Sequence, residues 1–290
     1  MFTTIKNFHK FFIEIKPETA LIIKSSKEDI SPSAADANFI RVNTPYGFSP
    51  IIPGSSLKGV IRSYSESILK GLGKEVCLFG NGYDCGKEMN KKIQNSYDVY
   101  KKACYACRMF GNMKMASVVR TEDFFPYRPE DSEESKINAV KNTEKNISLR
   151  TGIKINRYTG SVDKGALYET EALTGGKFYG VITLKNPEIW QVLIFMKTLM
   201  DINDGFKKIG GQKSRGYGKV TIKFEKIEIF SSDENNIVFT EFENDFFNSK
   251  DIINPKFSEK NPDIFGGKLK INSDNITEYY KYLSTHLKEW

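Results

Sequence analysis

Alternating apolar and polar positions along the chain predict several β-strands. Residues 11–26 (FFIEIKPETALIIKSS) alternate and are rich in β-branched side chains, which is typical of one long strand or of two strands separated at Pro17. Residues 116–125, 177–186 and 220–230 have the same character, and NFIRV within the polar stretch 27–50 is compatible with a short strand. The chain therefore has enough strand-forming segments for one sizeable sheet.

Three other segments have helical periodicity. In the first, apolar residues recur at three- and four-residue spacing after Pro53, at Leu57, Ile61, Tyr64 and Ile68. Ser55 or Ser56 is the expected N-cap of this helix, and GLG (71–73) is expected to end it. Residues 187–201 predict a second helix with Pro187 in its first position, and residues 276–290 predict a closing helix.

The order of these elements predicts the fold class. A strand, a helix and a strand precede residue 125, and a strand, a helix and a strand follow residue 177. Two such halves predict an α+β fold of the split βαβ type with long insertions. Residues 126–146 are polar and charged and predict a loop, whereas 147–173 predicts a hairpin with a glycine-containing turn.

Charge points to the class of partner. The 290-residue chain has a net charge of +7, which favours an anionic partner, nucleic acid first, although abundant lysine alone could produce it. The basic residues are clustered: residues 136–164 hold seven basic and two acidic side chains, and 207–219 hold five and none. The N-terminus has no apolar core of a signal peptide, and no apolar run is long enough for a membrane span, so we expect a cytoplasmic protein.

The four cysteines form the pattern Cys77-x7-Cys85-x18-Cys104-x2-Cys107. A CxxC pair with two further thiols can supply the four soft ligands of a tetrahedral zinc ion, and four protein ligands leave no open position for catalysis. The sequence therefore predicts a structural Zn²⁺ that stabilises an insertion of low apolar content. Unrelated buried thiols and a redox pair are the two alternatives.

GGQKSRGYGK (210–219) combines four glycines with three basic residues and a tyrosine. Glycine permits close approach of a backbone, and the basic side chains suit phosphate. The competing explanation is a tight turn with solvated lysines, and the motif does not match a nucleotide-binding P-loop. The two histidines, His9 and His286, lie at opposite ends of the chain and are expected to be structural.

Two motifs carry a family resemblance. IPGSSLKGVIRS (52–63), followed far downstream by GGQKSRGYGKV (210–220), resembles the repeat-associated mysterious protein (RAMP) superfamily of CRISPR systems. CYACRMFGN (104–112) and TGIKINRYTGSVDKGALYETE (151–171) are similar to the backbone subunits of type III effector complexes, the Cas seven-like group. The resemblance covers residues 11–230.

This resemblance implies a RAMP domain over residues 1–230. Its ferredoxin-like, RNA-recognition-motif-like palm would comprise about 1–76, 114–125 and 174–230, with a zinc-binding insertion at 77–113 and a thumb hairpin at about 126–173. Residues 231–290 would be a C-terminal extension without an assigned role. The implied partners are guide CRISPR RNA, target RNA and other effector subunits, including copies of the chain itself, and no membrane.

The implied RNA contacts come from the helix start, the hairpin and the glycine-rich turn. They are Ser55, Ser56, Lys58, Arg62, Lys154, Arg157, Gly210, Gly211, Lys213, Arg215, Tyr217 and Lys219.

In members that cleave target RNA, a loop aspartate upstream of the PGSS motif acts with Mg²⁺ or Mn²⁺. Asp36 in ADANFIRV holds a similar place, and Asp29 is the competing candidate. The resemblance thus implies a metal-dependent endoribonuclease that uses the 2′-OH of the RNA as nucleophile. A catalytically silent guide-binding subunit and a guide-processing endoribonuclease are the alternatives, and the scarcity of histidine disfavours the second.

Overall fold

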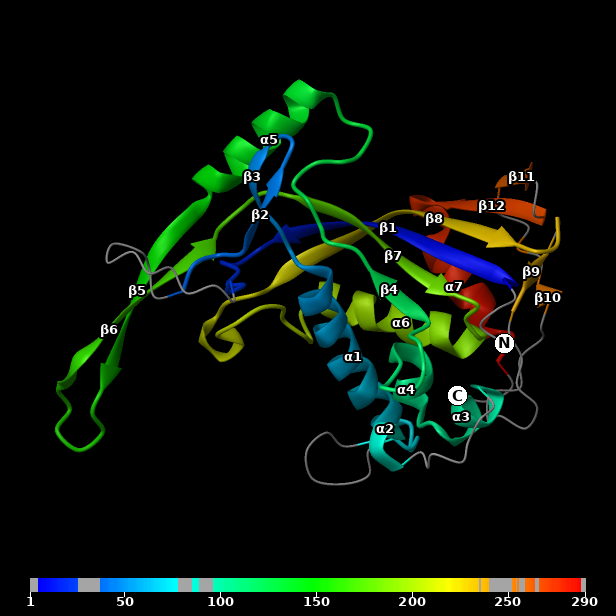
Figure 1. Ribbon diagram of the computed structural model, residues 1–290, viewed down its shortest axis with the longest axis horizontal. Helices are drawn as coiled ribbons and strands as arrows, with labels where there is room; N and C mark the ends of the chain where they lie inside the picture. Colours follow the sequence, from blue (N-terminus) through cyan, green and yellow to red (C-terminus); the bar gives the residue numbers. More distant parts are fainter. Residues whose placement is uncertain are drawn as a thin grey trace.

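The structure is a computed structural model that describes residues 5–25, 37–77, 85–88, 96–234, 236–239, 252–253, 255, 259–263 and 266–287. Its main feature is a six-stranded antiparallel sheet in the order β11-β12-β8-β1-β7-β4 (Figure 1). The strands are β1 (Asn7–Pro17), β4 (Val119–Thr121), β7 (Phe178–Lys185), β8 (Val220–Ser231), β11 (Glu259–Asp263) and β12 (Gly266–Asn272). The fold therefore mixes helices with an antiparallel sheet, as the sequence predicts.

The burial pattern of β1 distinguishes the two faces of the sheet. Phe11, Ile13 and Ile15 are buried on one face, whereas Phe8 and Lys10 point to the other and are only half-buried. Successive side chains of a strand alternate between faces, so this burial pattern identifies the covered side. It also explains why residues 11–15 alternate so clearly in the sequence.

The covered face packs against α1 (Gly54–Gly71), α6 (Ile189–Asn203) and α7 (Ile276–Ser284). The ring of Phe11 lies 4.8 Å from that of Phe195 on α6. Between α1 and α6, the buried hydroxyls of Ser65 and Thr198 lie 2.9 Å apart. Helix α6 is buried along almost its whole length, which places it at the centre of the core.

The predicted strand–helix–strand halves are both present. In the first, α1 lies between β1 and β4, and in the second, α6 lies between β7 and β8. In the sheet, β1 and β7 are neighbours, with β8 beside β1 and β4 beside β7. The strand predicted over 116–125 is shorter than expected: β4 covers only Val119–Thr121, and beyond it Phe125 forms an isolated bridge with Tyr179 of β7.

The predicted hairpin over 147–173 is also present, as β5 (Ile147–Ile155) and β6 (Val162–Leu173). Figure 1 shows it projecting away from the main sheet. At its root lie α5 (Glu133–Lys145) and the small hairpin of β2 (Arg41–Thr44) and β3 (Gly47–Pro50). The projecting hairpin exposes several apolar side chains: Leu149, Ile153, Ile155, Val162 and Leu167.

Two local predictions are wrong. Residues 126–146 are not a loop throughout, since α5 begins after Ser132, whose hydroxyl accepts a hydrogen bond from Ser135 N at 3.3 Å. Its narrow buried stripe left little apolar signal in the sequence. Pro187 is not the first residue of α6, because Glu188 is the N-cap and forms a capping box with Gln191.

The remaining elements belong to the cysteine-containing segment and the C-terminal part. The short helices are α2 (Cys85–Glu88), α3 (Ser96–Lys102), α4 (Tyr105–Phe110), and the 3-10 turns η1 (Lys213–Arg215) and η2 (Ser273–Asn275). A small pair of strands, β9 (Ile237–Val238) and β10 (Ile252–Ile253), lies apart from the main sheet. After residue 231, β12 pairs with β8 and therefore extends the main sheet. In the described residues, no helix has the length and hydropathy of a membrane span.

Candidate functional site

The N-terminus of α1 is fixed against β4. Gly54 N donates to Asp123 Oδ1 at 2.8 Å, and Thr121 Oγ1 donates to Gly54 O at 2.8 Å. A Cβ at Gly54 would lie 2.5 Å from the backbone oxygen of Glu122, so only glycine fits this position. Contrary to the sequence prediction, neither Ser55 nor Ser56 is the N-cap of the helix, because the N-cap is Pro53, which makes no side-chain capping hydrogen bond.

The two serines are nevertheless placed for contact with an anion. Both are exposed, and their N–H groups precede the first hydrogen bond within the helix, from Leu57 N to Pro53 O at 3.1 Å. Such N–H groups, together with the helix dipole, favour negative charge.

Glycine at residue 54 gives a testable prediction with a matched control. We expect Gly54→Ala to destabilise the protein by about 1–3 kcal/mol, because the added methyl group collides with rigid backbone. Gly59 lies on the same helix with nothing within 4 Å of an added Cβ, so Gly59→Ala is expected to be stabilising by up to about 1 kcal/mol. Urea unfolding followed by circular dichroism measures both, and equal stabilities of the two variants would contradict the prediction.

The glycine-rich turn lies against the segment that follows β1. Gly211 N donates to Ile22 O at 2.8 Å, and Gly218 N donates to Ala20 O at 3.0 Å. Gly210 and Gly218 both have positive φ, and an added Cβ would lie 2.4 Å from Ile22 O at the first and 2.0 Å from Ile209 O at the second. The glycines therefore allow the backbone of the turn to pack closely against neighbouring backbone. This packing positions the basic side chains of the turn.

The start of α1 and the glycine-rich turn line one hollow of about 380 Å³, here called the α1–turn hollow. Its lining residues are Ile22, Ile23, Lys24, Ser56, Gly59, Val60, Ser63, Lys207, Gly210, Gly211 and Lys213. Three are lysines and none is acidic. The pKa of Lys213 is lowered by burial and then by the nearby charge of Lys207, so an anion in the hollow would relieve this repulsion.

Sequence analysis identified only part of this hollow. It named Ser56, Gly210, Gly211 and Lys213 but missed Lys24 and Lys207. It also missed Gly59 and Ser63, although these residues follow Ser56 at helical spacing and so share its face of α1. That spacing was the signal available in the sequence.

Lys58 and Arg62 lie on α1 but do not line the α1–turn hollow. Burial lowers the pKa of Lys58, and the charges of Arg62 and Arg120 lower it further, so three cations lie close together between α1 and β4. Arg62 donates to Glu66 Oε1 at 2.9 Å and to Gly111 O at 3.3 Å, and its Nη2 lies 3.8 Å from Cys107 Sγ. Arg62 thus connects α1 to the cysteine cluster, a role the sequence did not predict.

A second hollow of about 200 Å³ lies where the glycine-rich turn meets the projecting hairpin. It is lined by Ala20, Arg150, Arg215, Gly216 and Tyr217. Arg215 Nη1 donates to the hydroxyl of Tyr168 on β6 at 2.7 Å, so the turn and the hairpin are in direct contact. Two expected RNA contacts, Arg215 and Tyr217, therefore lie beside Arg150, a basic residue that no sequence motif indicated.

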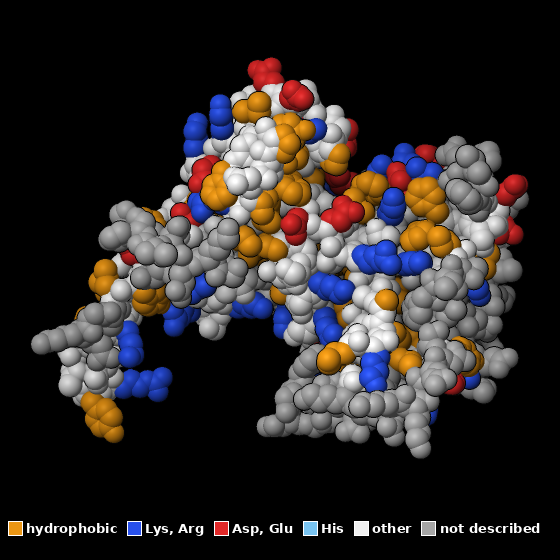
Figure 2. Space-filling model, viewed as in Figure 1, with side chains coloured by type: hydrophobic (Ala, Val, Ile, Leu, Met, Phe, Trp, Pro, Cys, Tyr) orange, Lys and Arg blue, Asp and Glu red, His pale blue; other side chains and the backbone are white. Residues whose placement is uncertain are grey.

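The remaining expected RNA contacts line neither hollow. Lys154 and Arg157 are exposed on the projecting hairpin. Lys219 Nζ forms an ion pair with Glu18 Oε2 at 2.6 Å. Figure 2 shows Lys and Arg side chains gathered along the concave side of the molecule, between the hairpin and α1. These basic side chains form one surface even though their segments are distant in the sequence.

The four cysteines form a compact cluster. All are buried, and their sulfur atoms lie within 4.8 Å of one another, with Cys77 Sγ and Cys107 Sγ 3.5 Å apart. Tetrahedral zinc with Zn–S bonds of about 2.3 Å places its sulfur ligands roughly 3.8 Å apart, so the spacing fits a four-cysteine metal site. Hydrogen bonding from Cys107 lowers the pKa of the Cys104 thiol to about 4, which favours the thiolate that a metal requires.

Polar contacts attach the cysteine-containing segment to the core. The buried hydroxyl of Tyr100 donates to Glu188, and Gln191 Nε2 donates to the same hydroxyl oxygen at 2.9 Å. Arg108 Nε donates to Ala103 O at 2.9 Å, which holds α4 to the end of α3. A metal at the cysteines would thus stabilise a segment that is already docked on α6.

Comparison with known proteins identifies the family. The family model of the RAMP superfamily matches residues 14–221, which include the end of β1, α1, the cysteine cluster, the hairpin and the glycine-rich turn. The chain belongs to the RAMP superfamily. It is 28% identical over 228 residues to the "CRISPR system Cms endoribonuclease Csm3" of Methanocaldococcus jannaschii, covering 74% of this chain and 77% of that protein.

The two candidate aspartates of this RAMP chain, Asp36 and Asp29, lie outside the described residues. The residue after Asp36 is held on the hairpin: Ala37 N donates to Glu169 O at 3.2 Å and Glu171 N donates to Ala37 O at 2.9 Å. Asp36 therefore directly precedes a residue anchored to β6.

Arg41 anchors the same segment more firmly. Its guanidinium forms ion pairs with Glu144 on α5 and Glu171 on β6, each at 2.7 Å. Glu171 Oε2 also accepts a hydrogen bond from Phe39 N at 2.6 Å. These contacts fix the chain just after Asp36 to the root of the hairpin.

Neither histidine of the RAMP chain has the surroundings of a catalyst. His9 is fully buried, with Nε2 2.9 Å from the hydroxyl of Tyr279 and Nδ1 3.0 Å from Asn7 Oδ1. Burial lowers its pKa to about 3, so it remains neutral and structural at physiological pH. His286 follows α7, where its Nδ1 lies 2.8 Å from Tyr282 O.

Proposed function

We propose that this RAMP chain is a backbone subunit of a type III CRISPR effector complex that binds guide RNA and cleaves complementary target RNA. The family assignment and the similarity to a curated protein named Csm3 endoribonuclease support the general role. The observation that carries the RNA-binding part is the convergence of the α1 N-terminus and the basic glycine-rich turn on one hollow, where the described lining residues include three lysines and no acidic side chain.

The fold supports the assignment of a palm. The order β8-β1-β7-β4 with α1 and α6 as crossover helices is that of a ferredoxin-like core, the arrangement of RNA-recognition motifs. In this proposal, β5 and β6 form the thumb, and 77–113 is a zinc-binding insertion. The apolar side chains exposed on the thumb favour contact with a protein partner, including a further copy of the chain.

Guide RNA is proposed to lie with its phosphates against the α1–turn hollow. The N–H groups of Ser55 and Ser56 would meet one phosphate, and Lys24, Lys207 and Lys213 would neutralise its neighbours. Arg150, Arg215 and Tyr217 would continue this surface toward the thumb. None of these groups reads a base edge, so base pairing with the guide would supply the specificity.

The test of this interface is the salt dependence of RNA binding. We expect Lys213→Ala to weaken binding of guide RNA whatever its sequence, and to reduce the slope of log affinity against log salt concentration by about 0.7–1. Lys223→Ala is the matched control, since Lys223 is exposed on β8 and lines neither hollow. Fluorescence anisotropy at several salt concentrations measures both.

If the slope of log affinity against log salt concentration is unchanged in Lys213→Ala, the glycine-rich turn has a structural role and its lysines contact only solvent. The same series with Lys58→Ala and Arg215→Ala separates the two sides of the interface. Lys58 lies beside β4, whereas Arg215 lies beside the thumb. A loss confined to one of the two would show along which side the RNA runs.

Cleavage is assigned to Asp36. RNA supplies its own nucleophile, the 2′-OH beside the scissile phosphate, and the protein must hold that hydroxyl in line with the leaving 5′-oxygen. A Mg²⁺ or Mn²⁺ ion held by the Asp36 carboxylate would supply electrostatic stabilisation of the developing charge. The products are a 2′,3′-cyclic phosphate and a 5′-OH. Ala37 and Arg41 support the assignment, because their contacts with β6 attach the Asp36 segment to the thumb.

A further inference from the structure

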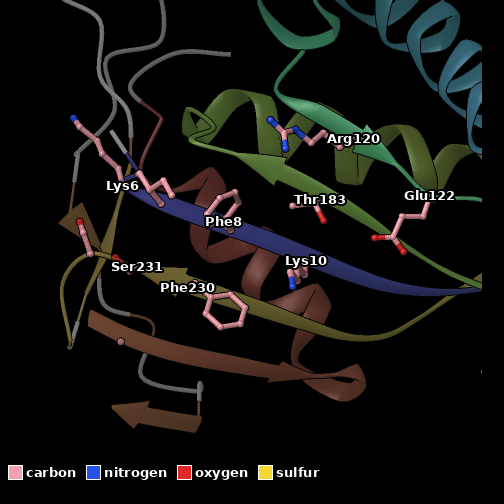
Figure 3. A pocket seen from close by; sticks show the side chains of 11 residues that line it. Lys6, Phe8, Lys10, Arg120, Glu122, Thr183, Phe230 and Ser231 are labelled. Atoms are coloured by element: carbon pink, nitrogen blue, oxygen red, sulfur yellow. The ribbon is translucent and has the colours of Figure 1, made fainter. Parts of the chain in front are cut away.

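The open face of the main sheet carries a hollow of about 710 Å³, here called the sheet-face hollow. It is lined by Ile5, Lys6, Phe8, Lys10, Arg120, Glu122, Thr183, Phe230, Ser231, Ser232 and Gly267. These residues come from β1, β4, β7, β8 and β12 and lie on the side away from the helices (Figure 3). Its volume is in the range of small-molecule sites, about 300–1,000 Å³.

Two aromatic rings form its apolar part. Phe8 on β1 and Phe230 on β8 are direct cross-strand partners, and both side chains are half-buried. Direct partners on one face have Cβ atoms about 5 Å apart, so the two side chains are neighbours on the open face and are together called the aromatic platform. A half-buried aromatic platform on a sheet is the surface on which unpaired nucleobases stack.

Cations surround this platform. The ammonium groups of Lys10 and Lys268 lie 5.3 and 5.1 Å from the centre of the Phe230 ring. The strand register places Lys10, Thr183 and Arg120 in one row across β1, β7 and β4. In the described residues, Lys6, Lys10 and Arg120 form no ion pair, and Glu122 is the single acidic residue of the lining.

We propose that the sheet-face hollow binds single-stranded RNA, with a base stacked on Phe8 and Phe230 and its phosphates at Lys6, Lys10 and Arg120. It is a second RNA contact, separate from the α1–turn hollow, and it does not depend on cleavage by Asp36. Arg120 lies close enough to Lys58 on α1 for their charges to interact, so the sheet-face hollow approaches α1 at this point.

The spread of the cations favours a polynucleotide over a free mononucleotide. Lys6 and Lys10 are separated by four residues of extended chain, about 13 Å, which exceeds the reach of one phosphate group. The hollow also lies on strands and not at a helix N-terminus or glycine-rich loop, where a compact di- or triphosphate is usually held. A strand of RNA would satisfy separated cations with successive phosphates.

The test uses the full chain with Lys58→Ala and Lys213→Ala as background, so that binding at the first interface is weakened. In this background we expect Phe8→Leu to lower the affinity for a labelled single-stranded 12-nucleotide RNA by at least about fivefold, because stacking is lost while apolar bulk is kept. The matched control is Phe12→Leu, on the same face of β1 but outside the hollow, where the Lys226 ammonium lies 4.2 Å from the ring centre. Its affinity is expected to equal that of the background.

A second variant tests the proposal at an exposed position, where a substitution is not expected to disturb folding. Arg120→Gln changes an exposed side chain and is expected to reduce the salt slope of the same RNA by about one phosphate contact. Thermal unfolding midpoints check that all variants fold. Equal affinities of the Phe8→Leu and Phe12→Leu variants, with no change in slope for Arg120→Gln, overturn the proposal.

Competition experiments distinguish binding of an RNA strand from binding of a free mononucleotide. Displacement of the RNA by a second single-stranded RNA, but not by AMP or ATP at the same nucleotide concentration, supports the proposal. Displacement by AMP or ATP at that concentration overturns it and assigns the hollow to a mononucleotide. If the proposed guide interface fails instead, Lys58→Ala and Lys213→Ala leave RNA affinity unchanged while Phe8→Leu still lowers it, so the two failures are distinguishable.

Discussion

Replacing Asp36 with alanine is expected to abolish Mg²⁺- or Mn²⁺-dependent cleavage of target RNA, lowering the rate by at least about a hundredfold. A metal held by the carboxylate would contribute several kcal/mol of charge stabilisation, and no other side chain has been assigned to replace it. The measurement is single-turnover cleavage by the complex reconstituted with guide RNA and complementary target. Assembly and guide binding are expected to be unchanged, since the contacts that hold this segment come from Ala37, Phe39 and Arg41.

Asp29→Ala is the matched control for cleavage. It removes a carboxylate from the same polar stretch and is expected to cleave like the wild type. Asp36→Asn, which keeps the size of the side chain but not its charge, is expected to be as inactive as Asp36→Ala. If Asp29→Ala alone loses activity, the assignment moves to Asp29. A wild-type complex that binds target without cutting it would show that the subunit is catalytically silent.

Removing one cysteine ligand is expected to destabilise the protein by about 4 kcal/mol or more, which would lower the melting temperature by roughly 8 °C or more. The four sulfur atoms are buried within 4.8 Å of one another, so Cys104→Ser would leave the other three thiols without the ion that brings them together. Arg62 on α1 contacts both Gly111 O and the Cys107 sulfur, so disorder of the cysteine-containing segment would also destabilise α1. Calorimetry with metal analysis measures the effect.

The matched comparison for the metal site is among the cysteines themselves. For a structural zinc ion, the wild type is expected to contain one zinc per chain, and serine at Cys77, Cys85, Cys104 or Cys107 is expected to remove it. Removal of metal by a chelator should reproduce the loss of stability, and added Zn²⁺ should restore it. If serine lowers the stability only at Cys104 and Cys107, and the zinc content is unchanged, the redox alternative is favoured.

Much of the fold followed from local patterns. The strands at 178–185 and 220–231 and the helices at 54–71 and 189–203 were found because each buries one face, or nearly all, of a regular element. Of the strand predicted over 11–26, only the part up to Pro17 is present, and it begins earlier, at Asn7. Helix α5 was missed, because it packs only a narrow stripe against β3 and β5 and its outer face is polar. Burial creates the periodic signal, so an element with little burial gives little signal.

Parts of the site could be predicted for a similar reason. The spacing of the cysteines indicated a cluster, because four thiols within a short segment are close whatever the surrounding fold. The helix start and the glycine-rich turn were each recognisable, but not the lysines that complete their hollow. Lys24 and Lys207 belong to no motif and reach the hollow only because residues 18–22 pair with the turn.

Two of the predicted RNA-binding residues have protein partners that the sequence did not indicate. Arg62 was expected to grip RNA, yet its partners Glu66 and Gly111 make it a connection between α1 and the cysteine segment. Lys219 was expected to touch RNA, yet it pairs with Glu18. Such partners compete with a ligand for the charged side chain, and the sequence does not contain that information.

The α+β class, the strand–helix–strand halves, the cysteine cluster and the two motifs that mark the RAMP superfamily could all be predicted from the sequence. These features depend on residues near one another in the chain or on short motifs. Only the tertiary structure decided which cations share a hollow, which are neutralised, and that Phe8 and Phe230, 222 positions apart, form one platform on the open sheet face. Those relations depend on strand register and on packing between distant segments, which no local pattern records.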